Sequence, residues 1–404
     1  MRPGSIRVLN KAHYGGRNAS NLFVNRLQTD LQQVGDYTLV EEAVTVLVRR
    51  EGAGRDGMKE GVPCERSPAT DVIFHHVDDI QGAGEHVESD LEELGKKMKI
   101  GKVGVLREGG SDRFTGINIQ MERGRLYLSQ MKYLQEVDTD RILEMAGGSR
   151  AAVDEHAMRE VETEEIDPSI QDEVGAANGI LGWGTKLLWK NCVFYHELQR
   201  HVRNPCRRML RNVGLVLEKV KKEKQRIELR PLGEKGRKVH VYTDCGRKKK
   251  TKMVRKGVVA FWGDETRSHE EGDEWNPVFY KTEKEVMPGP LPKSEEEERL
   301  MDSSHAGELI SLKFGAKEIW RVLYLIDELT GAFPEVIVYI DSAALHACLR
   351  SGKVTKEPEL QPELDYIIQT FRRMGVNPES GVVWTPRALN RADWLTKPIW
   401  GKKG

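Results

Sequence analysis

The sequence predicts two kinds of fold in one chain, α+β in the first part and α/β in the last part, joined by a helical segment. Three observations support this fold class. Before residue 150, apolar residues recur at helical spacing and then in extended runs. After Lys238, strand patterns alternate with helix patterns, and a long amphipathic helix separates two groups of strands. The length of 404 residues fits two or three domains.

The N-terminal part begins with a predicted helix. Phe23, Leu27 and Leu31 are four residues apart and would share one helix face. Residues 37–48 and 72–77 are rich in apolar and β-branched side chains, which favours extended strands. The glycine-rich stretch 52–61 between these runs is typical of a hairpin loop or a disordered insertion.

The middle part reads as a linker followed by helices. Seven acids lie in the fifteen positions from Asp154 onward, and Pro168 ends this run. Such a run of like charge predicts a solvated linker. From Ile170 to Lys224 the apolar pattern is helical again and ends in a charged stretch, which we interpret as a solvated helix end.

The C-terminal part contains the clearest elements. The long helix carries an apolar stripe that includes Leu309, Leu312 and Ile319. Trp384 and Trp394 are interpreted as core residues. The expected strands are 238–244, 254–262, 275–281, 335–340 and 380–384, and the expected helices are 304–329, 342–350, 361–375 and 389–396.

Composition excludes several classes of protein. Lys plus Arg equal Asp plus Glu at 63 each, so net charge identifies no partner. The five cysteines form no CxxC pair, which argues against a zinc site and against a disulfide framework. The N-terminus lacks the apolar core of a secretion signal, and no apolar run approaches the roughly 20 residues that cross a bilayer. We expect an intracellular protein, cytoplasmic or nuclear, with no membrane partner.

Four carboxylates lie where ligand sites form in α/β sheets. Asp244 and Asp341 end the first and fourth predicted strands, whereas Glu308 and Asp393 lie near helix starts. Such positions meet at one edge of an open sheet. Each acid alone also fits a plainer role, a turn residue for Asp244 or a helix cap for Asp341. Because all four lie at such positions, a shared site for two hard divalent cations is the better interpretation.

Two further charged motifs are candidates for function. Asp78 and Asp79 follow directly after the apolar run 72–77. Seven of the ten residues from 247 to 256 are basic, in the turn between the first two C-terminal strands, which favours phosphate contact with salt-dependent affinity. A solvated hairpin or a nuclear localisation signal remains an alternative. The nucleic-acid-binding candidates are Arg247, Lys248, Lys249, Lys250 and Lys252.

The order of four motifs resembles the ribonuclease H domain of retrotransposon polyproteins. The motifs are Thr243-Asp244-Cys245-Gly246, Ala306-Gly307-Glu308-Leu309, Tyr339-Ile340-Asp341-Ser342 and Asn390-Arg391-Ala392-Asp393-Trp394-Leu395-Thr396-Lys397-Pro398. The last is similar to the closing motif of copia-type long-terminal-repeat elements. Upstream, the segment from Asn10 to Ser20 resembles the Tyr-Gly segment of their reverse transcriptase, Val77-Asp78-Asp79-Ile80 resembles its Val-Asp-Asp motif, residues 114–119 and 126–133 resemble its palm-to-thumb region, and 171–222 resembles the connection.

This resemblance implies a partial reverse-transcriptase palm and thumb in residues 1–150, a linker and helical connection in 151–235, and a ribonuclease H-like mixed-sheet domain in 236–404. It implies that Asp244, Glu308, Asp341 and Asp393 hold two Mg²⁺ (or Mn²⁺) ions and cleave the RNA strand of RNA–DNA hybrids. Asp78 and Asp79 would be metal ligands of the polymerase. Other parts of a Pol polyprotein are the further expected partners.

Departures from the family limit the expected activity. The family polymerase needs another metal-binding Asp before the Tyr-Gly segment, and only nine residues precede Asn10. Asn18 and Ser20 also replace a family glutamine and proline. We therefore expect no polymerase activity from this chain alone, as a polyprotein fragment or a decayed element. The alternative function is a catalytically silent, element-derived protein that binds nucleic acid or a partner.

Overall fold

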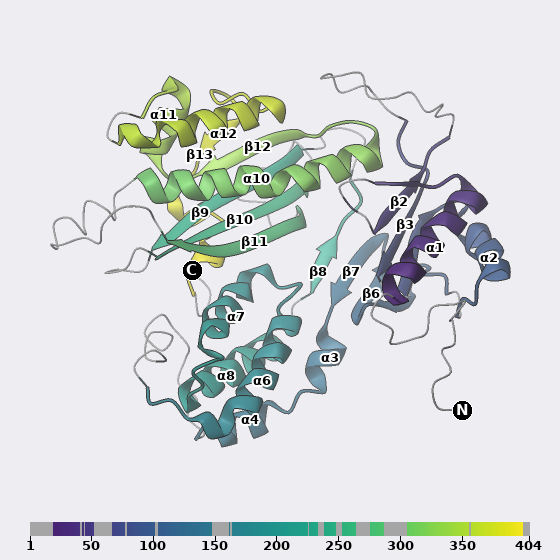
Figure 1. Cartoon of the computed structure of the whole chain (residues 1–404), viewed down its shortest axis with the longest axis horizontal. Coiled ribbons are helices and arrows are strands. Elements are labelled where there is room, and N and C mark those ends of the chain that lie inside the picture. The colour runs from purple at the N-terminus through teal and green to yellow at the C-terminus, as the bar shows by residue number, and fades with distance from the viewer. Residues whose placement is uncertain are drawn as a thin grey trace, which may run out of the picture. The chain divides into compact units, whose positions relative to one another are not determined.

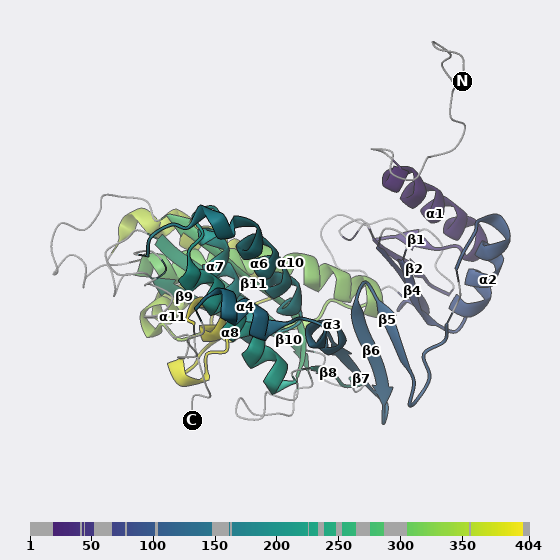
Figure 2. The same ribbon diagram turned by 90° about the horizontal axis from the view of Figure 1, so that it is seen from below.

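The described residues of the computed structural model form two compact units, seen from two directions in Figures 1 and 2. Unit 1 holds the described residues up to Arg107, with Asp112–Thr115 and Leu323–Phe333, and unit 2 holds the others. In the described part of the chain, no helix is long and apolar enough to cross a membrane. The structure describes residues 19–40, 43, 45–51, 67–76, 79–101, 104–147, 161, 164–224, 226–232, 238–247, 253–263, 275–286, 305–354 and 357–398.

Unit 1 contains a four-stranded antiparallel sheet covered by two helices on one face (Figure 2). Leu27 and Leu31 of the first helix are fully buried against Leu47 and Ile73 of the sheet, so the predicted helical stripe is confirmed. The strands, in sheet order, are β1 (Thr38–Leu39), β2 (Val46–Arg49), β3 (Asp71–His76) and β4 (Asp79–Gly84), and the helices are α1 (Ala19–Gly35) and α2 (Val87–Lys97).

The predicted extended run 37–48 is divided into two strands. The Val40 amide donates a hydrogen bond to the Val46 carbonyl at 2.9 Å, which closes a turn between β1 and β2. Val46 and Val48 are buried on the opposite sheet face, where Leu329 from the C-terminal turns of α10 (His305–Thr330) packs. The predicted loop 52–61 lies outside the described residues.

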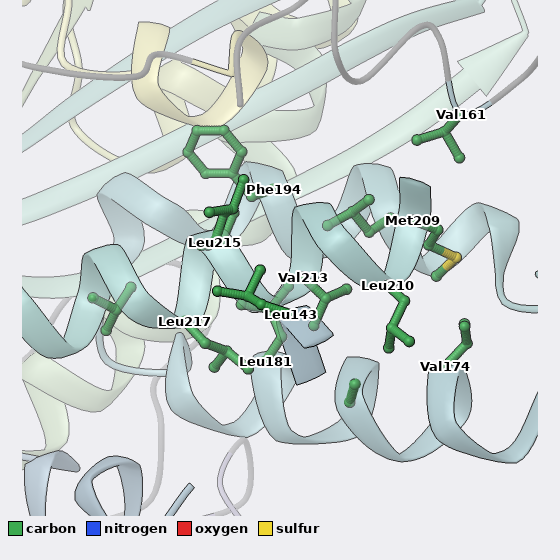
Figure 3. Packing of buried hydrophobic residues seen from close by; sticks show 14 of the residues in the cluster. Leu143, Val161, Val174, Leu181, Phe194, Met209, Leu210, Val213, Leu215 and Leu217 are labelled. Carbon is green, nitrogen blue, oxygen red and sulfur yellow. The ribbon is translucent and has the colours of Figure 1, made fainter. Parts of the chain in front are cut away.

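The first part of unit 2 joins short strands to a helical bundle. The predicted helical pattern from 170 to 224 is confirmed as several helices, which surround one core of buried apolar side chains (Figure 3). The elements are β6 (Ile117–Glu122), β7 (Arg125–Ser129), α3 (Met131–Gln135), α4 (Thr139–Met145), η1 (Pro168–Ile170), α6 (Gln171–Gly184), η2 (Trp189–Asn191), α7 (Cys192–Leu198), η3 (Gln199–His201), α8 (Arg207–Glu223) and β8 (Ile227–Leu229). Of strand β5 (Ser111–Phe114), only Ser111 belongs to unit 2.

The second part of unit 2 is a mixed five-stranded sheet with helices on both faces. The strand order is β11-β10-β9-β12-β13; the first three strands are antiparallel, and β12 and β13 run parallel to β9. Figure 1 shows α10 lying over the sheet. The remaining elements are β9 (Lys238–Arg247), β10 (Met253–Gly263), β11 (Asn276–Val286), β12 (Glu335–Ile340), α11 (Ala343–Ser351), η5 (Pro358–Leu360), α12 (Gln361–Arg373), β13 (Val382–Trp384), η6 (Arg387–Leu389) and α13 (Asp393–Thr396).

The two faces of this sheet carry different cores because side chains alternate along each strand. On the α10 face, the predicted stripe of Leu309, Leu312 and Ile319 is buried, which confirms the long helix. On the other face, Tyr242 of β9 packs with Trp189 of η2, and Leu395 of α13 belongs to the same cluster. The helices η2 and α7 therefore help to cover the sheet.

The last predicted helix, 389–396, is wrong in its first half. Asn390 has an extended backbone, with φ −72° and ψ 107°, between η6 and α13. Its side chain donates to the Thr243 carbonyl at 2.9 Å and accepts from the Ala392 amide at 3.1 Å. These bonds favour an extended Asn390 over a helical one and fix the start of α13 at Asp393.

Candidate metal centre

Asp244 lies in the middle of the mixed sheet and is almost fully buried. It belongs to β9, where it pairs with Gly257 of β10, and only 1% of its surface is exposed. A carboxylate so deeply buried requires partners, because burial of an isolated charge is costly. The prediction that the strand ends at Asp244 is wrong, because β9 continues to Arg247 in its pairing with β10.

Two glycines allow α13 to approach Asp244. A Cβ atom on Gly246 would lie 2.6 Å from the Thr396 carbonyl oxygen, and one on Gly257 would lie 2.8 Å from Thr396 Cγ2. Any side chain at either position would push Thr396 away from the sheet. Because both positions are glycine, Thr396 Oγ1 reaches Asp244 and donates a hydrogen bond to its Oδ2.

Glu308 comes to Asp244 from the opposite face of the sheet, on the first turn of α10. The helix lies close to β9 because a Cβ on Gly307 would meet Cys245 Sγ at 2.7 Å and one on Gly315 would meet Thr243 Cγ2 at 2.5 Å. The Ser311 hydroxyl also donates to the Asp244 carbonyl oxygen. This contact joins the helix to the backbone of the strand beside the acids.

Asp341 follows directly after β12, the strand next to β9. The cap of the following helix is its neighbour Ser342, whose Oγ accepts from the Leu345 amide at 3.2 Å. The Asp341 carboxylate is therefore not the helix cap. The Trp384 indole donates to the Asp341 carbonyl oxygen at 3.2 Å, which fixes the backbone at this strand end.

Three of the four predicted acids meet. Asp244, Glu308 and Asp341 each offer a carboxylate oxygen, and these atoms all lie within 4.8 Å of one another. We call these three residues the acid triad. In the described part of the chain, the side chains of Glu308 and Asp341 have no hydrogen-bond or ion-pair partner on another residue.

Asp393 lies beside the acid triad but is neutralised by a lysine. It is 2% exposed at the start of α13, and Lys397 Nζ contacts its Oδ1. The same ammonium lies 3.2 Å from Asp244 Oδ2. The four acids thus divide into the acid triad and an acid that shares Lys397 with Asp244.

Burial, with repulsion between the acids added to it, makes the acid triad hard to ionise. Burial first, and then the charges of Asp244 and Asp341, raise the pKa of Glu308 well above its ordinary value. Burial also raises the pKa of Asp341, and the charge of Asp244 adds to the rise. The pKa of Asp244 is raised by burial in spite of the Lys397 charge.

The donor set of the acid triad fits a hard divalent cation. All three ligands are carboxylate oxygens, which Mg²⁺ and Mn²⁺ prefer, and a bound cation would relieve the repulsion that raises their pKa values. The identity of the metal follows from no single contact, because both ions accept the same oxygen ligands.

The other predicted site residues do not belong to the acid triad. Asp79 is an exposed residue at the start of β4, and its Oδ2 accepts from the Thr115 amide at 3.2 Å. Asp78 lies outside the described residues. Arg247 ends β9, and the basic residues Lys248, Lys249, Lys250 and Lys252 lie outside the described part of the chain.

Sequence reasoning missed three residues beside the acids. Lys397 and Thr396 belong to the quoted closing motif, and their spacing from Asp393 on a helical turn was the available signal. Trp384 was predicted in the core, which is wrong, because it is 47% exposed on β13 at the edge of the sheet. Trp394 is partly buried against the cluster that contains Tyr242, as expected of a core residue.

Comparisons with known proteins give weak similarities. No protein-family model matches the chain, and neither does any curated protein. RNase H1 from the halophilic archaeon Halobacterium salinarum NRC-1 is 16% identical, with a TM-score of 0.28, over 39% of this chain and 94% of that one.

Two other solved structures give similar values. The N-terminal RNase H domain of Rv2228c from Mycobacterium tuberculosis, fused to maltose-binding protein, is 16% identical over 40% of this chain and 91% of that one, with a TM-score of 0.27. LC11-RNase H1 in complex with an RNA/DNA hybrid is 19% identical over 39% and 93%, also with a TM-score of 0.27. TM-scores below 0.5 assign no fold to this chain.

Proposed function

We propose that this chain carries a metal-dependent ribonuclease H that cleaves the RNA strand of RNA–DNA hybrids. The observation that carries the proposal is the meeting of Asp244, Glu308 and Asp341 within 4.8 Å, from the central strand β9, the start of α10 and the end of β12, which are far apart in the sequence. The order of the motifs around these acids supports the same function, as does the mixed sheet on which they lie.

The acid triad would hold Mg²⁺ or Mn²⁺. When bound, such an ion activates water as a nucleophile and stabilises the leaving oxygen of a phosphodiester. Asp244 is kept in place by Thr396 on its carboxylate and by Ser311 on its carbonyl oxygen. The role of these protein contacts is to hold the carboxylate where a cation shared with Glu308 and Asp341 would bind.

The substrate would approach near exposed residues at the rim of the site. Arg387 is exposed on η6, and its charge acts on Glu308, whose pKa it lowers against the larger effects of burial and of the neighbouring acids. A guanidinium in this position suits a backbone phosphate. Selection of RNA over DNA would come from contacts to 2′-hydroxyl groups. The basic residues after Arg247 remain predicted phosphate contacts.

The proposal includes an origin in a copia-type retrotransposon. Its support is the collinear order of the motifs from Asn10 to Pro398. In unit 1, His76 pairs with Asp79 across the β3–β4 connection, and Asp79 is the first residue of β4. The reverse-transcriptase remnant and the other Pol segments as partners remain predictions.

Hybrid cleavage by the full chain tests the function. With Mg²⁺ or Mn²⁺, the chain should cut the RNA of an RNA–DNA hybrid and leave duplex DNA intact. Asp341→Asn and Glu308→Gln should each reduce the rate about a hundredfold or more, because metal ions supply several kcal/mol and about 1.4 kcal/mol corresponds to tenfold. The measurement is the initial rate of release of labelled RNA fragments.

Glu359→Gln is the matched control because Glu359 is an exposed acid on η5. It should cleave at the parent rate. Equal cleavage by the triad variants would show that the nuclease site lies elsewhere. Hybrid binding without cleavage by a folded, metal-loaded parent would favour the alternative function, a catalytically silent nucleic-acid-binding protein.

A further inference from the structure

The Lys397 ammonium lies between two buried acids and contacts both of them. Its Nζ contacts Asp393 Oδ1 and lies 3.2 Å from Asp244 Oδ2, and both acids are no more than 2% exposed. The Lys397 side chain itself is 28% exposed. An ammonium is therefore located between two of the four carboxylates from which the sequence predicted a site for two cations.

The two carboxylate oxygens of Asp244 differ in their contacts. Oδ2 accepts from both Thr396 and Lys397, the last residues before Pro398. In the described part of the chain, Oδ1 accepts no hydrogen bond. One oxygen of Asp244 thus belongs to the C-terminal segment, and the other remains for a cation held with Glu308 and Asp341.

Charge balance favours one metal ion over two. One divalent cation and the Lys397 ammonium leave a single negative charge on the four ionised acids. A second divalent cation would give the cluster a net positive charge and would lie against the ammonium, in a buried place where like charges repel strongly.

We propose that Lys397 replaces the second metal ion, so that the free protein binds one divalent cation at Asp244, Glu308 and Asp341. Lys397 acts as a positioning residue, since it neutralises Asp393 and orients Asp244. The inference rests on the proposed function, because that function supplies the reason for a metal at these acids. It replaces the two-cation site expected from the sequence with a site of one cation and one lysine.

Metal binding by the full chain tests the role of Lys397. Titration with MnCl₂ alone, followed by calorimetry and by electron paramagnetic resonance, should give one bound Mn²⁺ with the spectrum of an isolated ion. Lys397→Met removes the charge but keeps an unbranched side chain. This variant should bind two Mn²⁺, and the two ions should be exchange-coupled because paired sites lie about 3.5–4 Å apart.

Two control variants separate charge from side-chain loss. Lys397→Arg keeps a cation and should bind one Mn²⁺. Lys317→Met removes an exposed lysine from α10, the helix that carries Glu308. Lys317 lies nine residues after Glu308 and about 13 Å further along the helix axis. This variant should also bind one Mn²⁺. Glu308→Gln should weaken Mn²⁺ binding in the parent and in the Lys397→Met background.

The outcomes distinguish this inference from the proposed function. Two Mn²⁺ bound by a parent that cleaves hybrid would overturn the role of Lys397 and leave the ribonuclease in place. One Mn²⁺ bound by a folded Lys397→Met variant would also overturn it. If neither protein binds Mn²⁺, the metal-dependent function fails as well. The parent stoichiometry remains a test even if Lys397→Met does not fold.

Discussion

At the scale of residues, the acid triad lowers the stability of the fold that positions it. Glu308 is half-buried beside Asp244 and Asp341, and burial first, then the charges of these two acids, raise its pKa. Ligand sites often keep such unfavourable contacts because they are needed for function. The folded chain without metal should therefore gain stability when one of these charges is removed.

We predict that Glu308→Gln stabilises the chain in EDTA by about 0.5–2 kcal/mol, the range typical of stabilising substitutions. The direction in which stability changes with pH follows from the raised pKa of Glu308. Since folded Glu308 binds its proton more tightly than the unfolded chain does, parent stability should fall as pH rises from the ordinary carboxyl range through the folded pKa. Urea unfolding at several pH values measures this.

Glu359→Gln should leave the urea midpoint of the parent unchanged, since that residue is exposed. With saturating Mn²⁺, the order should reverse, because the parent gains binding energy that Glu308→Gln lacks. A variant less stable than the parent in EDTA would mean that Glu308 has a stabilising partner.

The acids were predictable, whereas their neighbours were not. Asp244 and Asp341 end apolar runs, and a strand end is visible in sequence. The contact of Lys397 with Asp244 joins residues 153 positions apart, and no local pattern encodes such a distance. Trp384 was misassigned because hydrophobicity predicts burial but does not show that its strand is at the edge of the sheet.

At the scale of elements, an ion-pair cluster joins α7 to the mixed sheet. Glu197 of α7 pairs with Arg255 of β10 and lies 2.8 Å from Lys284 of β11. Arg255 is only 4% exposed in its side chain, so it depends on this carboxylate. Burial raises the pKa of Glu197, but Arg255 and Lys284 outweigh it and lower the value to about 2.

We predict that Glu197→Gln destabilises the chain by about 3 kcal/mol at pH 7, near the lower end for a broken buried pair, because a buried Arg255 loses its countercharge. The depressed pKa of Glu197 determines how this contribution to stability changes with pH. The contribution of Glu197 is present above its ordinary pKa of 4.5 and is lost as pH falls towards about 2. The stability difference between parent and variant should shrink over that window.

Glu363→Gln is the control for an exposed pair. Glu363 contacts Lys313, and both side chains are more than a third exposed. Its loss should cost at most about 1 kcal/mol. Equal effects of the Glu197 and Glu363 substitutions in urea unfolding would show that the Arg255 pair does not stabilise the packing of α7 on the sheet.

Elements with a strong apolar period were predictable, and those that depend on close packing were not. The stripe of Leu309, Leu312 and Ile319 predicts α10 directly because a helix repeats every 3.6 residues. The short helix α13 has only four residues. Its position depends on the glycines at 246 and 257, whose contacts with Thr396 involve segments far apart in the chain.

At the scale of the whole molecule, the predicted boundary at residue 236 would expose two apolar surfaces. Trp189 and Cys192 belong to the buried cluster of Tyr242 and Leu395, on the sheet face that carries α13. The last turns of α10 pack, within unit 1, against the cluster of Val46 and its neighbours. A fragment of residues 236–404 lacks both packing partners, η2 and α7 on the sheet and the Val46 cluster on α10.

We therefore predict that residues 236–404 alone are less stable than residues 164–404, which retain η2 and α7 over the sheet. The difference should be several kcal/mol, since removal of one large buried aromatic side chain alone costs about 3–5 kcal/mol. Urea unfolding and dye binding to exposed apolar surface measure it. The shorter fragment should bind more dye before it unfolds.

A substitution within the longer fragment separates the effect of lost packing on the sheet from the effect of a shorter fragment. Trp189→Ala in residues 164–404 removes the 8%-exposed indole that packs edge-on against Phe261 and should account for much of the loss. Tyr366→Ala, at an aromatic residue that is 42% exposed on α12, should cost far less. Because the surface left by α10 is common to both fragments, it does not contribute to their difference. Equal midpoints for 236–404 and 164–404 would show that the sheet is stable without η2 and α7 and would support an independent domain from residue 236.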